Sequence, residues 1–257
     1  MIDIHTHILP ACDDGSPDME TSLKKIRKMA EAGIDGIVLT PHFMRNQYYN
    51  TFNVITSKFK ELKSQLKKEN IPVNIYQAAE VYLDGNIIKD IKSEKLVIAD
   101  TNYVLVETNL TGFPSNLFDI LYELVKSGYR PILAHPERYA NIINDPSSAE
   151  DLVHRDIYMQ LNAGSLIGHY GRSVKKAAWY LLEKGLTHFL ASDDHCKSED
   201  YSLPAAMEEI RKQIDDYTVK LLTEVNPEKM LNNEKIDFFY LESTEDAPKG
   251  LLNRIFR

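Results

Sequence analysis

Short apolar segments alternate with longer amphipathic segments along this chain, and this alternation constrains its fold more than any other feature. The apolar segments have the length and composition of strands and cover residues 2–5, 36–41, 73–78, 103–107, 131–135, 158–162 and 188–192. Segments with apolar residues at helical spacing cover 18–33, 52–69, 115–128, 174–185 and 205–219. Repeated strand–helix units of this kind are typical of a parallel sheet covered by helices.

The length of the chain favours one domain. Its 257 residues match the usual size of a single parallel α/β barrel, and no internal repeat, low-complexity tract or Gly/Ser linker divides them. We therefore expect an α/β barrel over residues 1–240. Residues 241–257 form a tail whose composition changes from acidic to basic and apolar. Such a tail suits contact with an anionic membrane surface or a protein partner, and it equally suits packing on the barrel or fraying.

Composition and charge argue against several classes of protein. There are 38 acidic and 30 basic side chains, a formal net charge of −8, and no dense basic run, which argues against nucleic-acid binding. No apolar segment approaches the roughly 20 residues of a membrane-spanning helix. The chain opens with the strand-like Ile2–Ile4 rather than a leader, and its two cysteines are too few for a disulfide framework. We therefore expect a cytoplasmic protein.

Nearly every predicted strand runs into a side chain that can bind metal. The six strand-end residues are His5, His42, Glu80, Glu107, His135 and Asp193. In a parallel barrel the carboxyl ends of the strands converge on one face, so these side chains are expected to form one site. The pairs His5/His7 and Asp193/His195 are spaced two residues apart, which points both members of a pair the same way along a strand.

The residue types in this predicted site indicate metal chemistry. Carboxylates of Asp14, Glu80, Glu107 and Asp193 crowded into one mouth would repel each other, and divalent cations would relieve that repulsion. Imidazoles mixed with carboxylates suit zinc, manganese or iron, and so many donors exceed the needs of one ion, so we expect two or three ions. Neighbouring ions lower the pKa of a bridging water and clamp a phosphoryl group. The predicted reaction is hydrolysis of a phosphate ester.

The motifs of other phosphatases and of nucleotide enzymes are missing. A cysteine phosphatase needs an arginine six positions after the nucleophile, whereas Cys12 is followed there by Asp18 and Cys196 by Ser202. Neither a phosphate-binding loop nor a dinucleotide fingerprint occurs. The sequence therefore favours a metal-dependent reaction over a thiol-dependent one.

Five motifs occur in a characteristic order: Asp3-Ile4-His5-Thr6-His7, Asp13-Asp14-Gly15, Thr40-Pro41-His42, His135-Pro136-Glu137-Arg138 and Ser192-Asp193-Asp194-His195. This order resembles the polymerase and histidinol phosphatase (PHP) superfamily and, within it, the bacterial CpsB/CapC-type tyrosine-protein phosphatases. The resemblance implies a distorted seven-stranded (β/α) TIM-like barrel and a manganese-favouring trinuclear site. It also implies dephosphorylation of the tyrosine-rich tail of a cognate tyrosine kinase that controls capsule or exopolysaccharide export.

The resemblance also implies roles for individual residues. The metal ligands would be His5, His7, Asp14, His42, Glu80, Glu107, His135, Asp193 and His195. Glu80 would bridge two ions, and Arg138 would hold the substrate phosphate, for which a guanidinium fork is well suited. Asp13 and Asp14 compete for one ligand position, since either could instead cap the following turn. Asp194 is a candidate proton donor to the leaving group.

The sequence departs from the family pattern at two places. Many relatives have an apolar residue and a proline after the position of Glu107, where this chain has Thr108-Asn109. Beyond His195 the family often has an arginine that binds phosphate, where this chain offers Lys197. Arg45 is the loop residue that we add to Lys197 and Arg138 as a candidate substrate ligand.

Two other functions stay open at this point. A small-molecule phosphatase of the same superfamily, acting for example on histidinol phosphate, would use the same metals and differ at the rim, where Tyr48, Tyr49 and Phe113 suit an aromatic phosphoester. A metal-stabilised protein that binds the kinase without turnover is the second alternative. Of the remaining histidines, His188 is predicted to be structural, and His169 has no partner at chelating spacing, so an ordinary structural role is preferred for it over a place in the substrate cleft.

Overall fold

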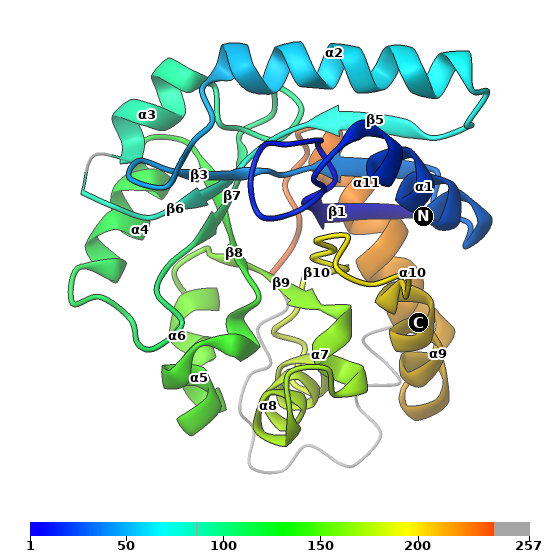
Figure 1. Ribbon diagram of the computed structural model, residues 1–257. Coiled ribbons are helices and arrows are strands. Elements are labelled where there is room, and N and C mark those ends of the chain that lie inside the picture. The colour runs from blue at the N-terminus through cyan, green and yellow to red at the C-terminus, as the bar shows by residue number, and fades with distance from the viewer. Residues whose placement is uncertain (86, 239–257) are drawn as a thin grey trace.

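The computed structural model describes residues 1–85 and 87–238 (Figure 1). The predicted tail over residues 241–257 lies outside the described residues. The strands are β1 (Ile2–Thr6), β2 (Gly36–Leu39), β3 (His42–Met44), β4 (Tyr48–Tyr49), β5 (Asn74–Gln77), β6 (Glu80–Tyr82), β7 (Tyr103–Glu107), β8 (Arg130–Ala134), β9 (Tyr158–Asn162) and β10 (Phe189–Ala191).

The strands form two hydrogen-bonded groups that follow the chain order. One group has the order β1-β2-β5, and the other has the order β10-β9-β8-β7-β6-β3-β4. The pairings are parallel except for the β3–β4 hairpin. The first and last strands also meet, because the amide of Asp193 donates to the carbonyl of His5 and that of His7 to the carbonyl of Asp194, each at 2.9 Å. The structure thus confirms the predicted α/β fold with parallel strands.

Two of the predicted strands are interrupted, and the interruption positions two candidate ligands. The segment predicted over 36–41 ends as β2 at Leu39, and the chain resumes as β3 at His42 after Pro41, which has no amide to donate. The segment over 73–78 likewise ends at Gln77, and β6 begins at Glu80. β3 and β6 pair in a register that places His42 opposite Glu80. The break therefore brings these two residues side by side.

The helices are α1 (Met19–Glu31), α2 (Phe52–Lys68), α3 (Ile87–Glu94), α4 (Leu117–Lys126), α5 (Ala140–Asn144), α6 (Ala149–Val153), α7 (Ala163–Ile167), α8 (Arg172–Glu183), α9 (Ser202–Gln213), α10 (Asp216–Lys220) and α11 (Asn226–Leu231). Short 3₁₀ turns cover Pro136–Arg138 and Pro146–Ser148, and a π-helical turn covers Leu221–Val225. The helix predicted over 205–219 is instead two helices, because the Asp215 carboxylate accepts the amide of Thr218 at 2.7 Å and starts α10.

The strands are buried on both faces. In β7, Leu105 packs inside with Ile4, Ile132 and Phe189, whereas its neighbour Val106 packs outward in the cluster that includes helix residues. This two-sided burial is expected of parallel strands covered by helices. In Figure 1, α2 runs along one side of the strands and α7 and α8 lie on the opposite side. Within the described part of the chain, none of the helices is both long enough and apolar enough to cross a membrane.

His188 precedes β10 and is part of this core, as the sequence predicts. Its side chain is 4% exposed, and its Nδ1 accepts a hydrogen bond from the amide of Met159 at 3.1 Å. Its ring meets Tyr158 edge-on, with a centroid distance of 5.1 Å. Burial lowers the pKa of His188 from 6.5 to about 3, so the ring stays neutral in the folded protein.

We predict that His188 makes the protein sensitive to acid. As the pH falls from 6.5 toward 3, the unfolded chain binds a proton at His188 that the folded chain does not, which costs about 2 kcal/mol of stability at pH 5. The drop in Tm between pH 7 and pH 5 should be smaller in His188→Gln than in the native protein. Replacing the exposed His154 by Gln is the control and should preserve the native drop. Equal drops in all three proteins would contradict the assignment.

Candidate metal and phosphate site

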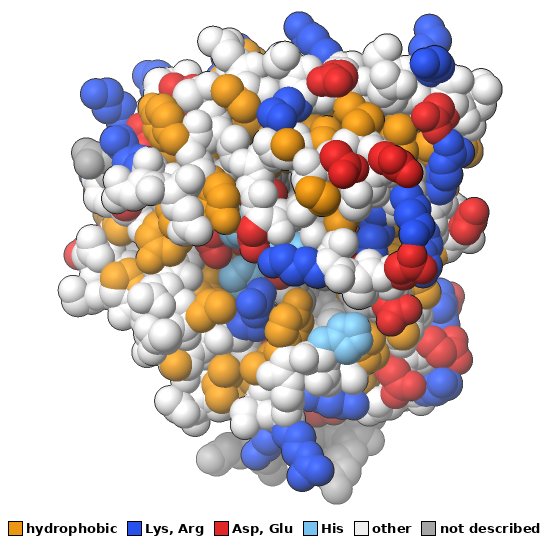
Figure 2. Space-filling view, in the orientation of Figure 1, with side chains coloured by type: hydrophobic (Ala, Val, Ile, Leu, Met, Phe, Trp, Pro, Cys, Tyr) orange, Lys and Arg blue, Asp and Glu red, His pale blue; other side chains and the backbone are white. Residues whose placement is uncertain are grey.

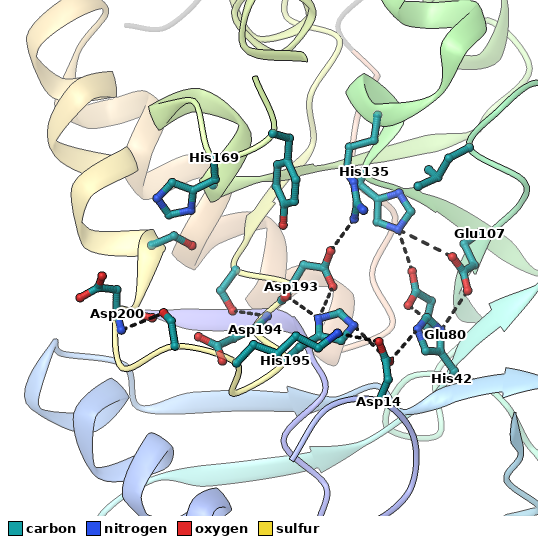
Figure 3. Close-up of a pocket in the computed structure, with 18 residues that line it drawn as sticks. Asp14, His42, Glu80, Glu107, His135, His169, Asp193, Asp194, His195 and Asp200 are labelled. Atoms are coloured by element: carbon teal, nitrogen blue, oxygen red, sulfur yellow. Dashed lines mark hydrogen bonds and ion pairs between the residues drawn. The ribbon is translucent and has the colours of Figure 1, made fainter. Parts of the chain in front are cut away.

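The structure brings all nine predicted ligands together, and Figure 3 shows those that line the cavity, such as His42, Glu80 and Asp193. Residues of β1 and the segment after it contribute His5, His7 and Asp14, and residues after β10 contribute Asp193 and His195. His42 and Glu80 begin β3 and β6, Glu107 ends β7 and His135 follows β8. Side chains that are up to 190 positions apart in the chain therefore share one site, as expected for a parallel barrel.

Eight of these side chains form three groups whose ligand atoms lie within 4.8 Å of one another: His7, Asp14, His42 and His195; His5, His7 and Asp193; and His42, Glu80 and Glu107. The ninth, His135, joins the third group, because its Nε2 lies 3.0 Å from Oε1 of Glu80 and 3.9 Å from Oε2 of Glu107. His7 and His42 each belong to two groups. Shared donors of this kind suit ions that are close neighbours.

Glu80 lies at the centre of the site. Its Oε2 is 3.2 Å from Nε2 of both His5 and His7 and 3.1 Å from Nδ1 of His42. Nevertheless, Oε2 of Glu80 and Nδ1 of His42 are buried and make no hydrogen bond. Buried polar atoms without hydrogen bonds are rare and costly, and a cation between them would satisfy both. This arrangement fits divalent metal ions.

The charges at the site are balanced internally. Burial lowers the pKa of His5, but the carboxylates of Glu80 and Asp193 outweigh it and raise that pKa to about 9. Burial raises the pKa of Glu80, but His5 and His135 outweigh it and hold that pKa well below its usual range. Glu80 and Asp193 are therefore ionised in the folded protein and are paired with positive charge on His5. Divalent cations would supply the same positive charge.

The structure distinguishes Asp13 from Asp14. Oδ2 of Asp13 accepts hydrogen bonds from Nδ1 of His7 and from the amide of His42, each at 2.8 Å. Asp14 instead faces the cavity, where its Oδ1 lies 3.6 Å from Nε2 of His42 and 3.4 Å from Nε2 of His195. Asp13 thus orients His7 so that Nε2 points into the site, and Asp14 is placed as the candidate ligand.

A chain of amides on β9 supports the site and was not predicted from the sequence. Nδ1 of His5 donates to Oε1 of Gln160 at 2.7 Å, which leaves Nε2 of His5 facing Glu80. Nε2 of Gln160 donates to Oδ1 of Asn162 at 2.8 Å, and Nδ2 of Asn162 donates to Oδ2 of Asp193 at 2.7 Å. The sequence feature that could have indicated this role is the pair of polar residues at alternate positions of the otherwise apolar strand β9. These contacts fix the orientation of one histidine and one carboxylate.

Gly15 allows the Asp13–Asp14 segment to pack directly on His7. A Cβ atom at position 15 would lie 2.0 Å from the carbonyl oxygen of His7 and 2.5 Å from its Cβ. No side chain can be accommodated at these distances unless the backbone moves. The close approach therefore depends on glycine.

We predict that Gly15→Ala displaces Asp13 and Asp14 and reduces phosphatase activity at least tenfold, because a misplacement of about 1 Å at a site can cost about a hundredfold in rate. Metal binding, followed by calorimetry, should weaken in parallel. Gly85 is exposed and a Cβ there would meet nothing within 4 Å, so Gly85→Ala is the matched control. Native activity in Gly15→Ala would show that the segment does not need this approach.

Seven of the nine side chains, all except the fully buried His5 and His7, line a cavity of about 450 Å³. The space-filling view shows histidine at the bottom of a hollow with basic side chains beside it (Figure 2). Arg138 lines the cavity, with Nη1 3.0 Å from Oδ2 of Asp193. Lys197 lines it as well and places Nζ 2.8 Å from Oδ2 of Asp14. His169 and Asp200 lie at the other end of the cavity (Figure 3). His169 thus lines the cavity, which is the alternative that the sequence did not favour.

Arg45 does not belong to this cavity. Its Nε and Nη2 donate to the two carboxylate oxygens of Asp90, each at 2.6 Å, and Arg45 is not among the lining residues. Because Asp90 occupies its guanidinium fork, the structure gives no support to Arg45 as a substrate ligand. The aromatic side chains predicted at the rim do not line the cavity either. Tyr48 stacks on His42, Tyr49 packs on Phe43 and Phe113 packs on Tyr139.

Asp194 lines the cavity, but its carboxylate is engaged elsewhere. Oδ2 accepts a hydrogen bond from Nζ of Lys25 at 2.9 Å, and Oδ1 accepts one from the amide of Cys196 at 2.7 Å. Lys25 is 5% exposed and also donates to the carbonyl oxygens of Ser198 and Asp200, at 2.8 and 3.2 Å. These contacts assign Asp194 a role in fixing the 194–200 loop and do not support a role as proton donor.

We predict that Lys25→Met lowers Tm by roughly 10 °C, because it leaves the Asp194 carboxylate partly buried without its cation, at a cost of about 3 kcal/mol. Activity should fall as well, since the loop carries His195 and Lys197. Lys24 is 72% exposed and pairs with Glu199, so Lys24→Met is the control and should change stability by less than about 1 kcal/mol. Similar Tm values for the two variants would contradict the role given to Lys25.

Comparisons with known proteins agree with this site. The family model for capsular polysaccharide synthesis, CpsB/CapC, matches residues 1–232. Tyrosine-protein phosphatase YwqE of Bacillus subtilis (strain 168) is 35% identical over 238 residues, which are 92% of this chain and 93% of YwqE. Tyrosine-protein phosphatase CpsB of Streptococcus agalactiae serotype III (strain NEM316) is 28% identical over 201 residues, with 76% of this chain and 83% of CpsB covered.

Solved structures give the same result. One chain comes from the crystal structures of YwqE from Bacillus subtilis and CpsB from Streptococcus pneumoniae, described as unique metal-dependent tyrosine phosphatases. It matches with a TM-score of 0.87 and 34% identity over 92% of this chain and 96% of that chain. A histidinol phosphate phosphatase from Lactococcus lactis matches with a TM-score of 0.53 and 12% identity, which shows a shared fold alone. The resemblance in the motifs is thereby confirmed, and this chain belongs to the CpsB/CapC family.

Proposed function

We propose that this protein is a metal-dependent protein-tyrosine phosphatase that acts on the phosphorylated tail of a cognate tyrosine kinase in capsule or exopolysaccharide synthesis. One observation carries the proposal: nine potential metal ligands lie together, and seven of them line a cavity that Arg138 also lines. Membership of a family with tyrosine-protein phosphatases among its members supports the substrate class. The cytoplasm remains the predicted location.

The nine side chains at the strand ends would hold two or three divalent ions, with manganese as our first choice and iron or zinc as alternatives for this mixture of imidazoles and carboxylates. When bound, such ions would supply a water of lowered pKa and stabilise negative charge on the phosphoryl oxygens. Glu80 has one oxygen beside His5, His7 and His42 and the other beside His135, which supports a bridging role.

Other residues of this chain would bind the substrate phosphate. Arg138 donates from Nη1 to Asp193, and other donors of its guanidinium fork would bind phosphate oxygens. Lys197 adds a second cation at the cavity, although Asp14 is its present partner. A tyrosyl oxygen leaves with a pKa of about 10, so the reaction does not require a strong general acid. The hydrogen bonds that already occupy the Asp194 carboxylate are consistent with a reaction that does not need it as a proton donor.

The two cysteines support a mechanism without a thiol nucleophile. Burial raises the pKa of Cys12 and of Cys196 to about 12, so both thiols are protonated at neutral pH. A cysteine phosphatase needs the opposite shift, because the thiolate is the nucleophile. The buried thiols therefore suit packing rather than catalysis.

We also propose that the sheet closes into a distorted seven-stranded barrel. The hydrogen bonds between the residues of β1 and those after β10 support this closure, as does the pairing of Thr6 with Asp194. Counting β2 with β3 and β5 with β6 as interrupted strands, and leaving out β4, which pairs antiparallel with β3, gives the seven strands that the sequence predicts. Closure would keep the donors from β1 and from the segment after β10 in one plane of the barrel mouth.

We predict manganese-dependent release of phosphate from a phosphotyrosyl peptide, which a chelator abolishes and added manganese restores. His42→Ala should lower the rate at least a hundredfold, because His42 belongs to two ligand groups and lies 3.1 Å from Glu80. The exposed His154→Ala is the matched control and should keep the native rate.

The same assay separates the two alternatives. A preference for histidinol phosphate over the peptide would move the protein to small-molecule metabolism. Metal binding without hydrolysis of either substrate would favour a regulator that binds the kinase. Full activity in His42→Ala would contradict the metal site itself.

A further inference from the structure

Tyr170 is an aromatic side chain of the cavity that the sequence did not single out. It follows α7, lines the cavity and is 40% exposed, which makes it one of the few large apolar side chains of the described chain with so much open surface. The three rim aromatics predicted from the sequence do not line this cavity. Tyr170 therefore offers an aromatic surface where the substrate enters.

The position of the Tyr170 ring is fixed by its neighbours. The guanidinium carbon of Arg138 lies 4.5 Å from the ring centroid, a cation–π contact. Gly164 also lets the ring approach the backbone of α7, because a Cβ at position 164 would lie only 3.2 Å from Cε2 of Tyr170. A ring in contact with both an arginine and a glycine backbone is pre-organised, so it loses little conformational entropy when it contacts a ligand.

We propose that Tyr170 forms the binding wall for the aromatic ring of the substrate, so that the site selects aryl phosphate monoesters over alkyl ones. The inference rests on the proposed function, because Arg138 must hold the phosphate group. A phosphate bound by Arg138 is only one ester bond away from the tyrosyl ring of the substrate. Because Arg138 contacts Tyr170, that ring would emerge beside the exposed part of Tyr170, where two aromatic rings attract each other in offset or edge-to-face geometry.

The geometry separates two effects of Tyr170. One is direct contact with the substrate ring, which only an aryl ester can make. The other is support of Arg138, which any phosphate would feel. Inorganic phosphate has no ring and reports on the second effect alone, whereas phenyl phosphate reports on both.

The experiment compares metal-loaded native protein with Tyr170→Phe and Tyr170→Leu. The readouts are KM for a phosphotyrosyl peptide, KM for phenyl phosphate, which is itself an aryl ester that the enzyme would hydrolyse, and the dissociation constant of inorganic phosphate. Tyr170→Leu should raise both KM values roughly fivefold, while the inorganic phosphate constant changes less than twofold. Tyr170→Phe keeps the ring and should stay within twofold of the native protein in all three values.

Tyr122→Leu is the matched control, since Tyr122 is 62% exposed on α4 and also lies under a cation, with Nζ of Lys126 5.8 Å from its ring centroid. It should leave every constant unchanged. An unchanged KM for phenyl phosphate in Tyr170→Leu would overturn the inference, and so would equal weakening of phenyl and inorganic phosphate. A native protein that binds both ligands but hydrolyses nothing would instead contradict the proposed function, while the dissociation constants of the two ligands would still test Tyr170.

Discussion

The attraction between buried carboxylates and imidazoles is the interaction on which the rest of this structure depends. Glu80 is 1% exposed and Asp193 5%, and each faces several histidines. Charges buried to this degree are very unfavourable unless they are paired. Because the partners come from different strands, the strands must end at matching heights for the charges to be balanced. The strand register that forms the sheet is therefore also the register that brings the buried charges together.

The sequence predicted which side chains lie together at the site because their positions follow from local rules. A strand can be recognised from a short apolar run, and parallel strands bring their carboxyl ends together, so His5 and Asp193 could be assigned to one site without knowledge of any contact. The interruptions at Pro41 and before Glu80 were not predicted, because they depend on pairing with neighbours such as the β3–β4 hairpin. Periodicity alone does not contain that information.

The layer behind the ligands was missed for a related reason. Lys25 contacts Asp194 across 169 positions of the sequence, and Gln160 contacts His5 across 155. A buried lysine in an amphipathic helix has the same sequence pattern as an exposed one, as its neighbour Lys24 illustrates. Arg45 shows the reverse error, since a cation in a loop near the site looked available until the structure placed Asp90 against it. Such contacts depend on the tertiary fold.

The site combines two parts with different origins. The metal-binding donors come from strand ends and the adjoining turns, whereas the aromatic wall comes from the segment after β9, where α7 ends in a left-handed turn at Gly168 with φ +94°. Asn162 connects the two parts, because its amide holds Asp193 and its side chain also interacts with Tyr170. Changes in the segment beyond Asn162 can therefore alter which ester fits without moving the donors. Changes at Asn162 itself would disturb both parts together.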